Sequence, residues 1–155
     1  MVGILLIAHR PLASAFALGV AHVYCAAAPA RAAQGLRALD VAPDADVVEM
    51  VAAARALAAE IDDGAGVLVL TDVFGATPGN VASELALSGR IAVLAGLNLP
   101  MLLRAVCYRD NPLPALVEKA LAGALHGVLQ VGNSSIPNQD CRPAGNDHPR
   151  LHNQQ

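Results

Sequence analysis

The chain has 155 residues, of which 55% are hydrophobic and 15% are charged, and its formal net charge is -3. A chain of this length is expected to form one domain around a single hydrophobic core. The slightly acidic balance provides no basic field for a phosphate backbone, so nucleic acid is not an expected partner.

The first predicted element is a strand. The apolar run Gly3–Ala8 is typical of a buried strand, and His9 stands where that run stops. An ionisable ring at the carboxyl end of a buried strand is either a hydrogen-bonded structural residue or a reactive one. Arg10 follows, and Pro11 suits the first turn of a helix predicted over 12–28.

Residues 11–30 contain no Asp, Glu, Lys or Arg, and a run of about 20 such residues could cross a bilayer. The run is rich in alanine and contains Ser14, His22 and Pro29. An apolar, strand-like segment precedes it, where a signal peptide would have a charged region. The prediction is therefore a helix inside a soluble protein, without membrane insertion.

The middle of the chain alternates strand and helix patterns. A weak strand is predicted around 35–41, and Asp44 is the expected cap of a helix with apolar residues at helical spacing from Val47 to Ile61. The run Val67–Thr71 has no polar alternation, as expected for a strand that helices cover on both faces. Thr77 is the predicted cap and Pro78 the predicted first residue of a helix that runs to about Ser88. A strand at 91–96 and a helix at 100–110 follow. The last predicted elements are a helix from Pro112 or Pro114 to His126 and a short strand at 128–131.

This order of elements predicts an α/β, doubly wound fold, with a mostly parallel four-stranded sheet and helices on both faces. Residues 1–131 would form the domain, and 132–155 would be a disordered tail of polar residues and scattered prolines. The tail residues Cys141, His148 and His152 resemble metal ligands, but a segment without a fold cannot hold tetrahedral geometry. No metal or other cofactor is predicted, and the absence of paired cysteine spacings favours a cytoplasmic location.

His9 and Asp72 are the residues best suited to chemistry. If the first and third strands are neighbours, the two side chains face each other at the carboxyl edge of the sheet. A carboxylate bonded to one imidazole nitrogen orients the ring and leaves the other nitrogen free to attack. Gly75 and the predicted cap Thr77 lead into a helix whose free N–H groups suit a phosphoryl group, so the pattern predicts phosphoryl transfer through histidine.

In these features the chain resembles the enzyme IIA component of the mannose family of the bacterial phosphoenolpyruvate-dependent sugar phosphotransferase system. The resemblance covers about residues 1–131. It depends on His9 at the end of the first strand, on the loop Asp72–Pro78 with Asn80 after it, and on Gly96–Met101 after the fourth strand.

The resemblance implies a phosphotransferase with a phosphohistidine intermediate. His9 would accept a phosphoryl group from the phosphocarrier HPr and pass it to a IIB protein, here a separate one, while Asp72 supports the ring. It also implies a homodimer in which the last strand, 128–131, is exchanged between the two copies. A regulatory interaction module, in which other proteins respond to the phosphorylation of His9, stays open as the alternative function.

The chain departs from the family pattern at three positions. Arg10 stands where a small residue is common, Phe74 replaces a tryptophan, and Ala76 stands where a second glycine is usual. Arg10 is either an ordinary solvated charge or a group that steadies the transferring oxygens. Asn98 could be only a turn residue, although the resemblance places its loop beside the site.

A response-regulator receiver domain is a third interpretation, because that fold also has an aspartate after its third strand. Such a site needs an acidic cluster after the first strand to bind a divalent cation. Here the first strand is followed by Ala8–Pro11, which contains a histidine and an arginine and would repel a cation. The receiver interpretation is therefore disfavoured.

Overall fold

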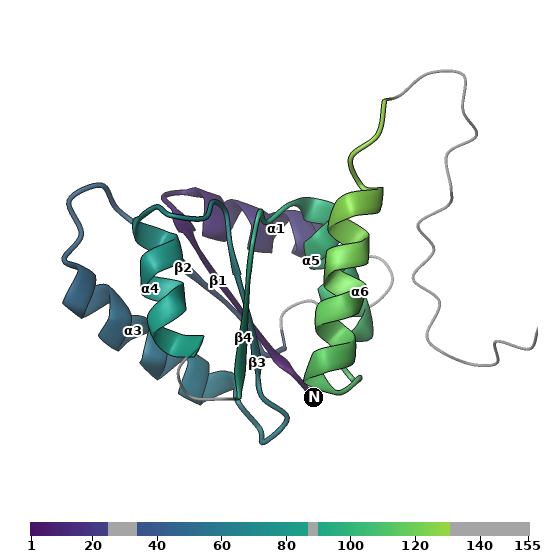
Figure 1. Ribbon diagram of the computed structural model, residues 1–155, viewed down its shortest axis with the longest axis horizontal. Helices are drawn as coiled ribbons and strands as arrows, with labels where there is room; N and C mark the ends of the chain where they lie inside the picture. The colour runs from purple at the N-terminus through teal and green to yellow at the C-terminus, as the bar shows by residue number, and fades with distance from the viewer. Residues whose placement is uncertain (25–33, 87–89, 131–155) are drawn as a thin grey trace, which may run out of the picture.

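The structure is a computed structural model that describes residues 1–24, 34–86 and 90–130. Its sheet has four strands in the order β2-β1-β3-β4, and all three neighbouring pairs are parallel (Figure 1). The strands are β1 (Gly3–His9), β2 (Leu36–Val41), β3 (Val67–Thr71) and β4 (Ile91–Ala95), and the helices are α1 (Leu12–Tyr24), α3 (Val47–Ile61), α4 (Thr77–Leu85), α5 (Leu99–Tyr108) and α6 (Leu113–His126). The predicted α/β fold is confirmed.

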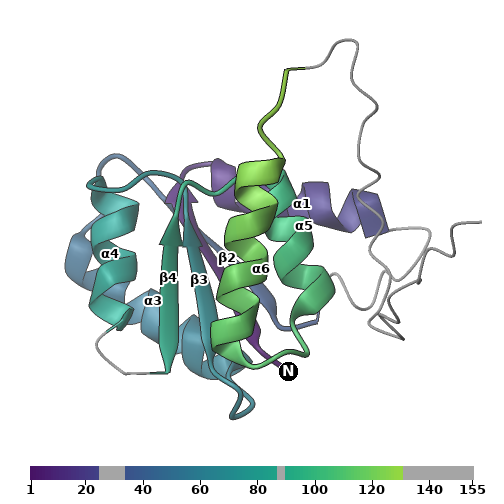
Figure 2. The same ribbon diagram turned by 45° about the vertical axis from the view of Figure 1, so that its right-hand side comes forward.

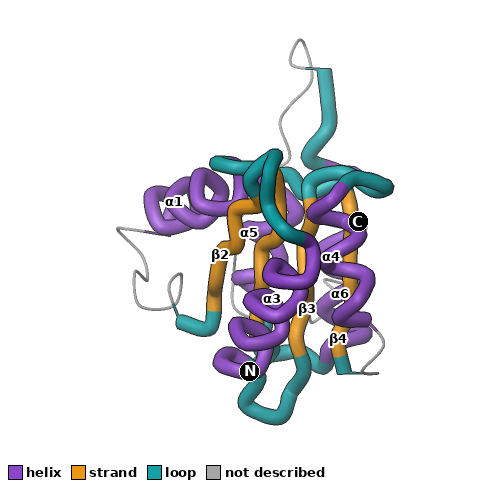
Figure 3. The backbone as a smooth tube through the Cα atoms, turned by 90° about the vertical axis from the view of Figure 1, so that its left-hand side faces the viewer, coloured by secondary structure: helices purple, strands orange, loops and turns teal. Residues whose placement is uncertain are grey.

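Helices cover both faces of the sheet, and β1 contributes to both layers. Leu5 and Ile7 pack with α3 and α4, whereas Ile4, Leu6 and Ala8 pack in the other layer with α1, α5 and α6. Figure 3 shows α3 and α4 in front of the strands, and Figure 2 shows α5 and α6 side by side on the opposite face. Successive side chains of β1 thus face opposite layers, and both layers are apolar. For this reason the strand is a continuous apolar run and does not alternate between polar and apolar residues.

The cap predicted for α3 is wrong by two residues. Asp46, and not Asp44, accepts hydrogen bonds from the N–H groups of Val48 at 2.8 Å and Glu49 at 3.0 Å. Asp46 has extended backbone directly before the first helical residue, which is the position from which a short side chain reaches these groups. Asp44 lies two residues too early for the same contacts.

The cap predicted for α4 is also wrong. Thr77 is the first residue of α4, and Ala76, whose side chain cannot accept a hydrogen bond, takes the cap position. Pro11 precedes α1, and its carbonyl accepts the first helical bond from Ala15 N–H at 3.0 Å. α4 therefore begins one residue before Pro78, the predicted first helical residue, whereas α1 begins at Leu12, where the helix predicted over 12–28 begins.

The remaining boundaries agree within two residues where the structure describes them. Residues 25–28, predicted to end the first helix, and Ser88, predicted to end the fourth, lie outside the described ranges. Residues 128–130 form no strand within the described chain, and Val131 and the tail 132–155 lie outside it, so the exchanged strand and the tail stay predictions. None of the described helices is long and apolar enough to cross a membrane.

Arg109 is fully buried at the end of α5 and connects that helix to the start of the sheet. Its guanidinium donates to the carbonyl oxygens of Val2 at 3.2 and 3.3 Å, Gly35 at 2.8 Å and Gln34. The N–H of Val2 donates in return to the Arg109 carbonyl at 2.8 Å. One charged side chain thus satisfies backbone groups at the entry to both β1 and β2.

Arg109→Met should therefore lower the free energy of unfolding by about 2–4 kcal/mol, because it leaves several buried carbonyls without donors. Urea unfolding followed by circular dichroism measures the change. Arg55→Met is the matched control, since Arg55 is exposed on α3 and its loss should change stability by no more than about 0.5 kcal/mol. Equal stability of the two variants would show that the Arg109 contacts contribute nothing.

Candidate functional site

The sheet topology brings His9 and Asp72 together. β1 and β3 are neighbours, and the strand order reverses at this point, since the chain goes from β1 outward to β2 and returns to β3 on the other side. Doubly wound sheets bind ligands at this kind of position, outside the carboxyl ends of the strands. The His9 Nδ1 and Asp72 Oδ2 atoms lie 2.7 Å apart.

Asp72 is a nearly buried carboxylate with 12% of its side chain exposed. Oδ2 also accepts from the His9 backbone N–H at 3.2 Å, and Oδ1 accepts from Val73 N–H at 2.9 Å. Burial alone would raise the pKa of Asp72, but the hydrogen bonds from the His9 ring and from these two N–H groups outweigh it and lower the pKa below its usual value. The carboxylate is therefore ionised at neutral pH.

An ionised Asp72 determines which nitrogen of His9 is reactive. Because a carboxylate only accepts hydrogen bonds, Nδ1 carries the proton that it donates to Asp72, and Nε2 carries the lone pair. The His9 side chain is 46% exposed, so the ring is accessible to another molecule. This arrangement is a nucleophile with an orienting group.

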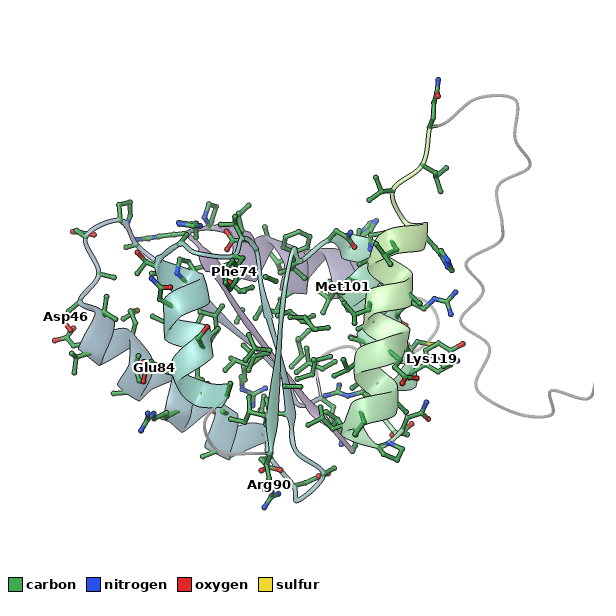
Figure 4. All side chains as sticks on the ribbon, viewed as in Figure 1. Asp46, Phe74, Glu84, Arg90, Met101 and Lys119 are labelled. Atoms are coloured by element: carbon green, nitrogen blue, oxygen red, sulfur yellow. The ribbon has the colours of Figure 1, made fainter. Side chains whose placement is uncertain are left out.

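The loop from β3 to α4 borders this pair. Gly75 has φ of +84°, a conformation that favours glycine, and an added Cβ would contact nothing within 4 Å, so the backbone angle and not crowding calls for glycine here. Phe74 is 85% exposed at the same end of the sheet (Figure 4). The N–H groups of Thr77 and Gly79, in the first turn of α4, have no hydrogen-bond acceptor among the described residues.

Side chains of the chain itself occupy the other helix starts at this edge. Asp40 accepts from the N–H of Ser14 in α1 at 3.2 Å and also from the Ser14 hydroxyl. Asp46 caps α3, and Asn98 caps α5 by accepting from Met101 N–H at 2.9 Å. Among the described helices that follow a strand, α4 alone begins without a side-chain acceptor, so its N–H groups are available to a bound anion.

Asn98 and Arg10 differ in their side-chain hydrogen bonds within the described structure. Asn98 caps α5 and also donates from Nδ2 to the Ala124 carbonyl at 3.2 Å, so its side chain joins α5 to α6 and acts as the turn residue considered above. The backbone N–H of Arg10 donates to the Val41 carbonyl at 3.0 Å, and its side chain is exposed. Thr77 is exposed as well, with its hydroxyl unpaired in the described structure.

The contact between Asp40 and Ser14 was not predicted from the sequence. Asp40 lies opposite Ala8 in the β1–β2 register, one residue before the position opposite His9. A signal was present, because a carboxylate near the end of an otherwise apolar strand suggests a cap for a neighbouring helix. No group of three or more His, Cys, Asp or Glu residues in the described ranges could hold a metal ion, and Cys141, His148 and His152 lie outside them.

Comparisons with known proteins identify relatives of this chain among components of the phosphotransferase system. The mannose-specific EIIAB component of Escherichia coli K12 is 32% identical over 74 residues, a stretch that covers 47% of this chain and 23% of that protein. The phosphotransferase system component EIIA from Streptococcus agalactiae superposes with a TM-score of 0.70 at 27% identity, over 84% of this chain and 97% of that one. The mannose/sorbose-specific IIA subunit from Enterococcus faecalis shares the fold, with a TM-score of 0.73 at 20% identity over 88% and 98% of the two chains.

The match to a protein family extends over most of the described chain. The EIIA-man family model, described as the PTS system fructose IIA component, matches residues 3–121, which include the four described strands, the His9–Asp72 pair and the start of α4. The protein belongs to the EIIA-man family of phosphotransferase-system IIA components.

Proposed function

We propose that the protein is a phosphoryl carrier of a sugar phosphotransferase system, which accepts a phosphoryl group from HPr on His9 and passes it to a separate IIB protein. The observation that carries the proposal is the 2.7 Å contact between His9 Nδ1 and Asp72 Oδ2, which leaves Nε2 as the nucleophile. Family membership supports the same reaction class. The proposal places the protein in the cytoplasm, with its partners.

The transfer step needs no proton to move. The His9 Nε2 lone pair forms a bond to phosphorus while the phosphorus–nitrogen bond of the donor phosphohistidine breaks, and the electron pair of that bond stays on the donor nitrogen. The Nδ1 proton of His9 stays in the hydrogen bond to Asp72 throughout. Asp72 thereby stabilises the positive charge that develops on the ring, and transfer to IIB reverses the step with a new acceptor.

The loop after Asp72 is the proposed binding site for the phosphoryl oxygens. The free N–H groups at the start of α4 provide donors, and the helix dipole favours a group that carries about two negative charges. Gly75 allows the loop to turn close to the ring, and the exposed hydroxyl of Thr77 is an additional donor. Phe74 offers an exposed aromatic side chain to a docking protein.

The test is phosphoryl uptake from labelled phosphoenolpyruvate in the presence of enzyme I and HPr. The expected product carries label that acid releases and base does not, as a phosphohistidine does, and peptide mapping should locate it at His9. Subsequent loss of the label to a IIB protein would complete the proposed relay. Acid-stable label on Asp72 would instead support the receiver interpretation.

A homodimer is part of the proposal, and the uncovered edge of β4 supports it. Among the described residues, β4 pairs only with β3, and Ile91–Ala95 contains neither a charge nor a proline, whereas β2 at the other edge carries Arg37 and Asp40. An apolar strand edge of this kind is a template for another strand. Beside it, the carboxyl end of α6 and the residues after it expose four large apolar side chains, Leu121, Leu125, Val128 and Leu129.

We therefore expect the full chain to sediment at twice its mass of 15.8 kDa at micromolar concentration. Leu125→Glu, or removal of residues 128–155, should shift it toward the monomer. Leu18→Glu is the matched control, because Leu18 is 71% exposed on α1 and Leu125 is 75% exposed on α6. A parent chain that sediments as a monomer, or variants that assemble like the parent, would contradict the dimer.

A further inference from the structure

Arg10 is a cation next to the nucleophile, and its backbone is held in place. Its N–H donates to the Val41 carbonyl at 3.0 Å, so the turn after β1 is tied to the end of β2. Its side chain is exposed, and the guanidinium forms no hydrogen bond or ion pair in the described structure. Arg37 and Arg90, by contrast, are paired with Glu60 at 2.6 Å and Asp62 at 3.0 Å.

Two carboxylates at this edge of the sheet, Asp72 and Asp40, are already engaged. Asp72 accepts from the His9 ring and from two backbone N–H groups, and Asp40 accepts twice from Ser14. Neither forms an ion pair with Arg10. The positive charge beside His9 is therefore uncompensated in the unphosphorylated protein.

We propose that Arg10 binds the phosphoryl group on His9 and so shifts the phosphoryl equilibrium between the carrier and this protein toward phosphorylated His9. This inference rests on the proposed function. Phosphorylation brings about two negative charges to the ring, one residue away from a guanidinium that has no other partner. Arginine forms strong, charge-assisted hydrogen bonds with phosphoryl oxygens, and here these bonds form only after transfer.

A binding role is separable from a role in docking. A charge at the rim of a docking surface changes the rate at which the carrier approaches, and it changes the forward and reverse transfer rates by the same factor. The equilibrium constant between the separated proteins depends only on the stability of their free phosphorylated and unphosphorylated forms. A change in that constant therefore reports an interaction between Arg10 and the phosphoryl group within this protein, and the Arg10→Lys variant tests whether that interaction needs the guanidinium.

The experiment mixes phosphorylated HPr with the parent, Arg10→Gln, Arg10→Lys or Arg55→Gln, and measures the distribution of label at equilibrium. Arg10→Gln should lower the equilibrium constant for His9 phosphorylation about fivefold at low ionic strength, and by less at high salt. Arg10→Lys, which keeps the charge but loses the planar fork, should give an intermediate value. Arg55→Gln removes an exposed charge of the same sign from α3 and should leave the constant unchanged.

An equilibrium constant for Arg10→Gln equal to that of the parent would overturn the inference, even if its transfer rates differ from those of the parent. An equal decrease with Arg55→Gln would also overturn it, because net charge would then be the cause. Absence of label from His9 of the parent would overturn the proposed function, and this inference with it. Labelling of His9 in the parent protein thus distinguishes a failure of the proposed function from a failure of the Arg10 inference alone.

Discussion

His9→Ala should abolish the uptake of label from phosphorylated HPr, since no other described residue combines an accessible ring nitrogen with an orienting carboxylate. His22 and His126 are exposed on α1 and α6, and neither has a carboxylate partner in the described structure. The fold should survive, because His9 is half-exposed at the end of β1 and makes its side-chain contact at the surface of the molecule. Labelling followed by separation of the protein from HPr measures the loss.

His22→Ala is the matched control, because it also removes a histidine ring but from an exposed position on α1. It should take up label as the parent does. Uptake by His9→Ala at the level of the parent would show that His9 is not the acceptor. The stability of that label toward acid and base would then identify the residue type that carries it.

The fold could be predicted because its two central strands, β1 and β3, are buried on both faces. Runs such as Gly3–Ala8 and Val67–Thr71 are continuously apolar only when helices cover the sheet on both sides, and the intervening helices require parallel strands. The contact between His9 and Asp72 follows from the same reasoning, since the carboxyl ends of adjacent parallel strands share one edge. These inferences depend on apolar runs and on the order of strands and helices. Such patterns extend over many residues, so a misinterpreted single residue does not change the predicted fold.

The helix caps could not be predicted with the same success, because they depend on single residues and on contacts between distant segments. Asp44 and Asp46 are equivalent by residue type, and only the backbone geometry selects Asp46. Asp40 acts as an acceptor for α1 although it lies 26 residues after Ser14 in the chain. The error at Thr77 has the largest consequence for the site. A Thr77 side chain in the cap position would accept a hydrogen bond from a backbone N–H group in the first turn of α4, and the structure leaves that group available.

The buried Arg109 shows another limit of the sequence. It precedes Asp110 and Asn111 in a polar turn, a setting typical of an exposed arginine. Its burial follows from the approach of the ends of β1 and β2 to the end of α5, where several backbone carbonyls lack donors. Only the assembled tertiary structure creates that requirement.

Asp72→Asn should slow phosphoryl transfer by roughly 10²–10⁴-fold while the fold is kept. An amide carries no charge to stabilise the developing positive charge on the His9 ring. Its Nδ2 can also donate to His9 Nδ1, which favours the tautomer with the proton on the attacking nitrogen Nε2. Rapid-quench measurements of transfer from phosphorylated HPr to the parent and the variant give the ratio of rates.

The same substitution has a smaller and pH-dependent effect on stability. The pKa of Asp72 is lower in the folded protein than in the unfolded chain, so the ionised carboxylate adds stability that is complete above the unfolded pKa of about 4 and is lost as the pH falls through the folded value. Asp72→Asn should therefore be less stable than the parent by about 1 kcal/mol at pH 7, and the difference should close as the pH falls through the folded pKa of Asp72. A transfer rate equal to that of the parent, together with a large loss of stability at pH 7, would show that Asp72 supports the fold and not the chemistry.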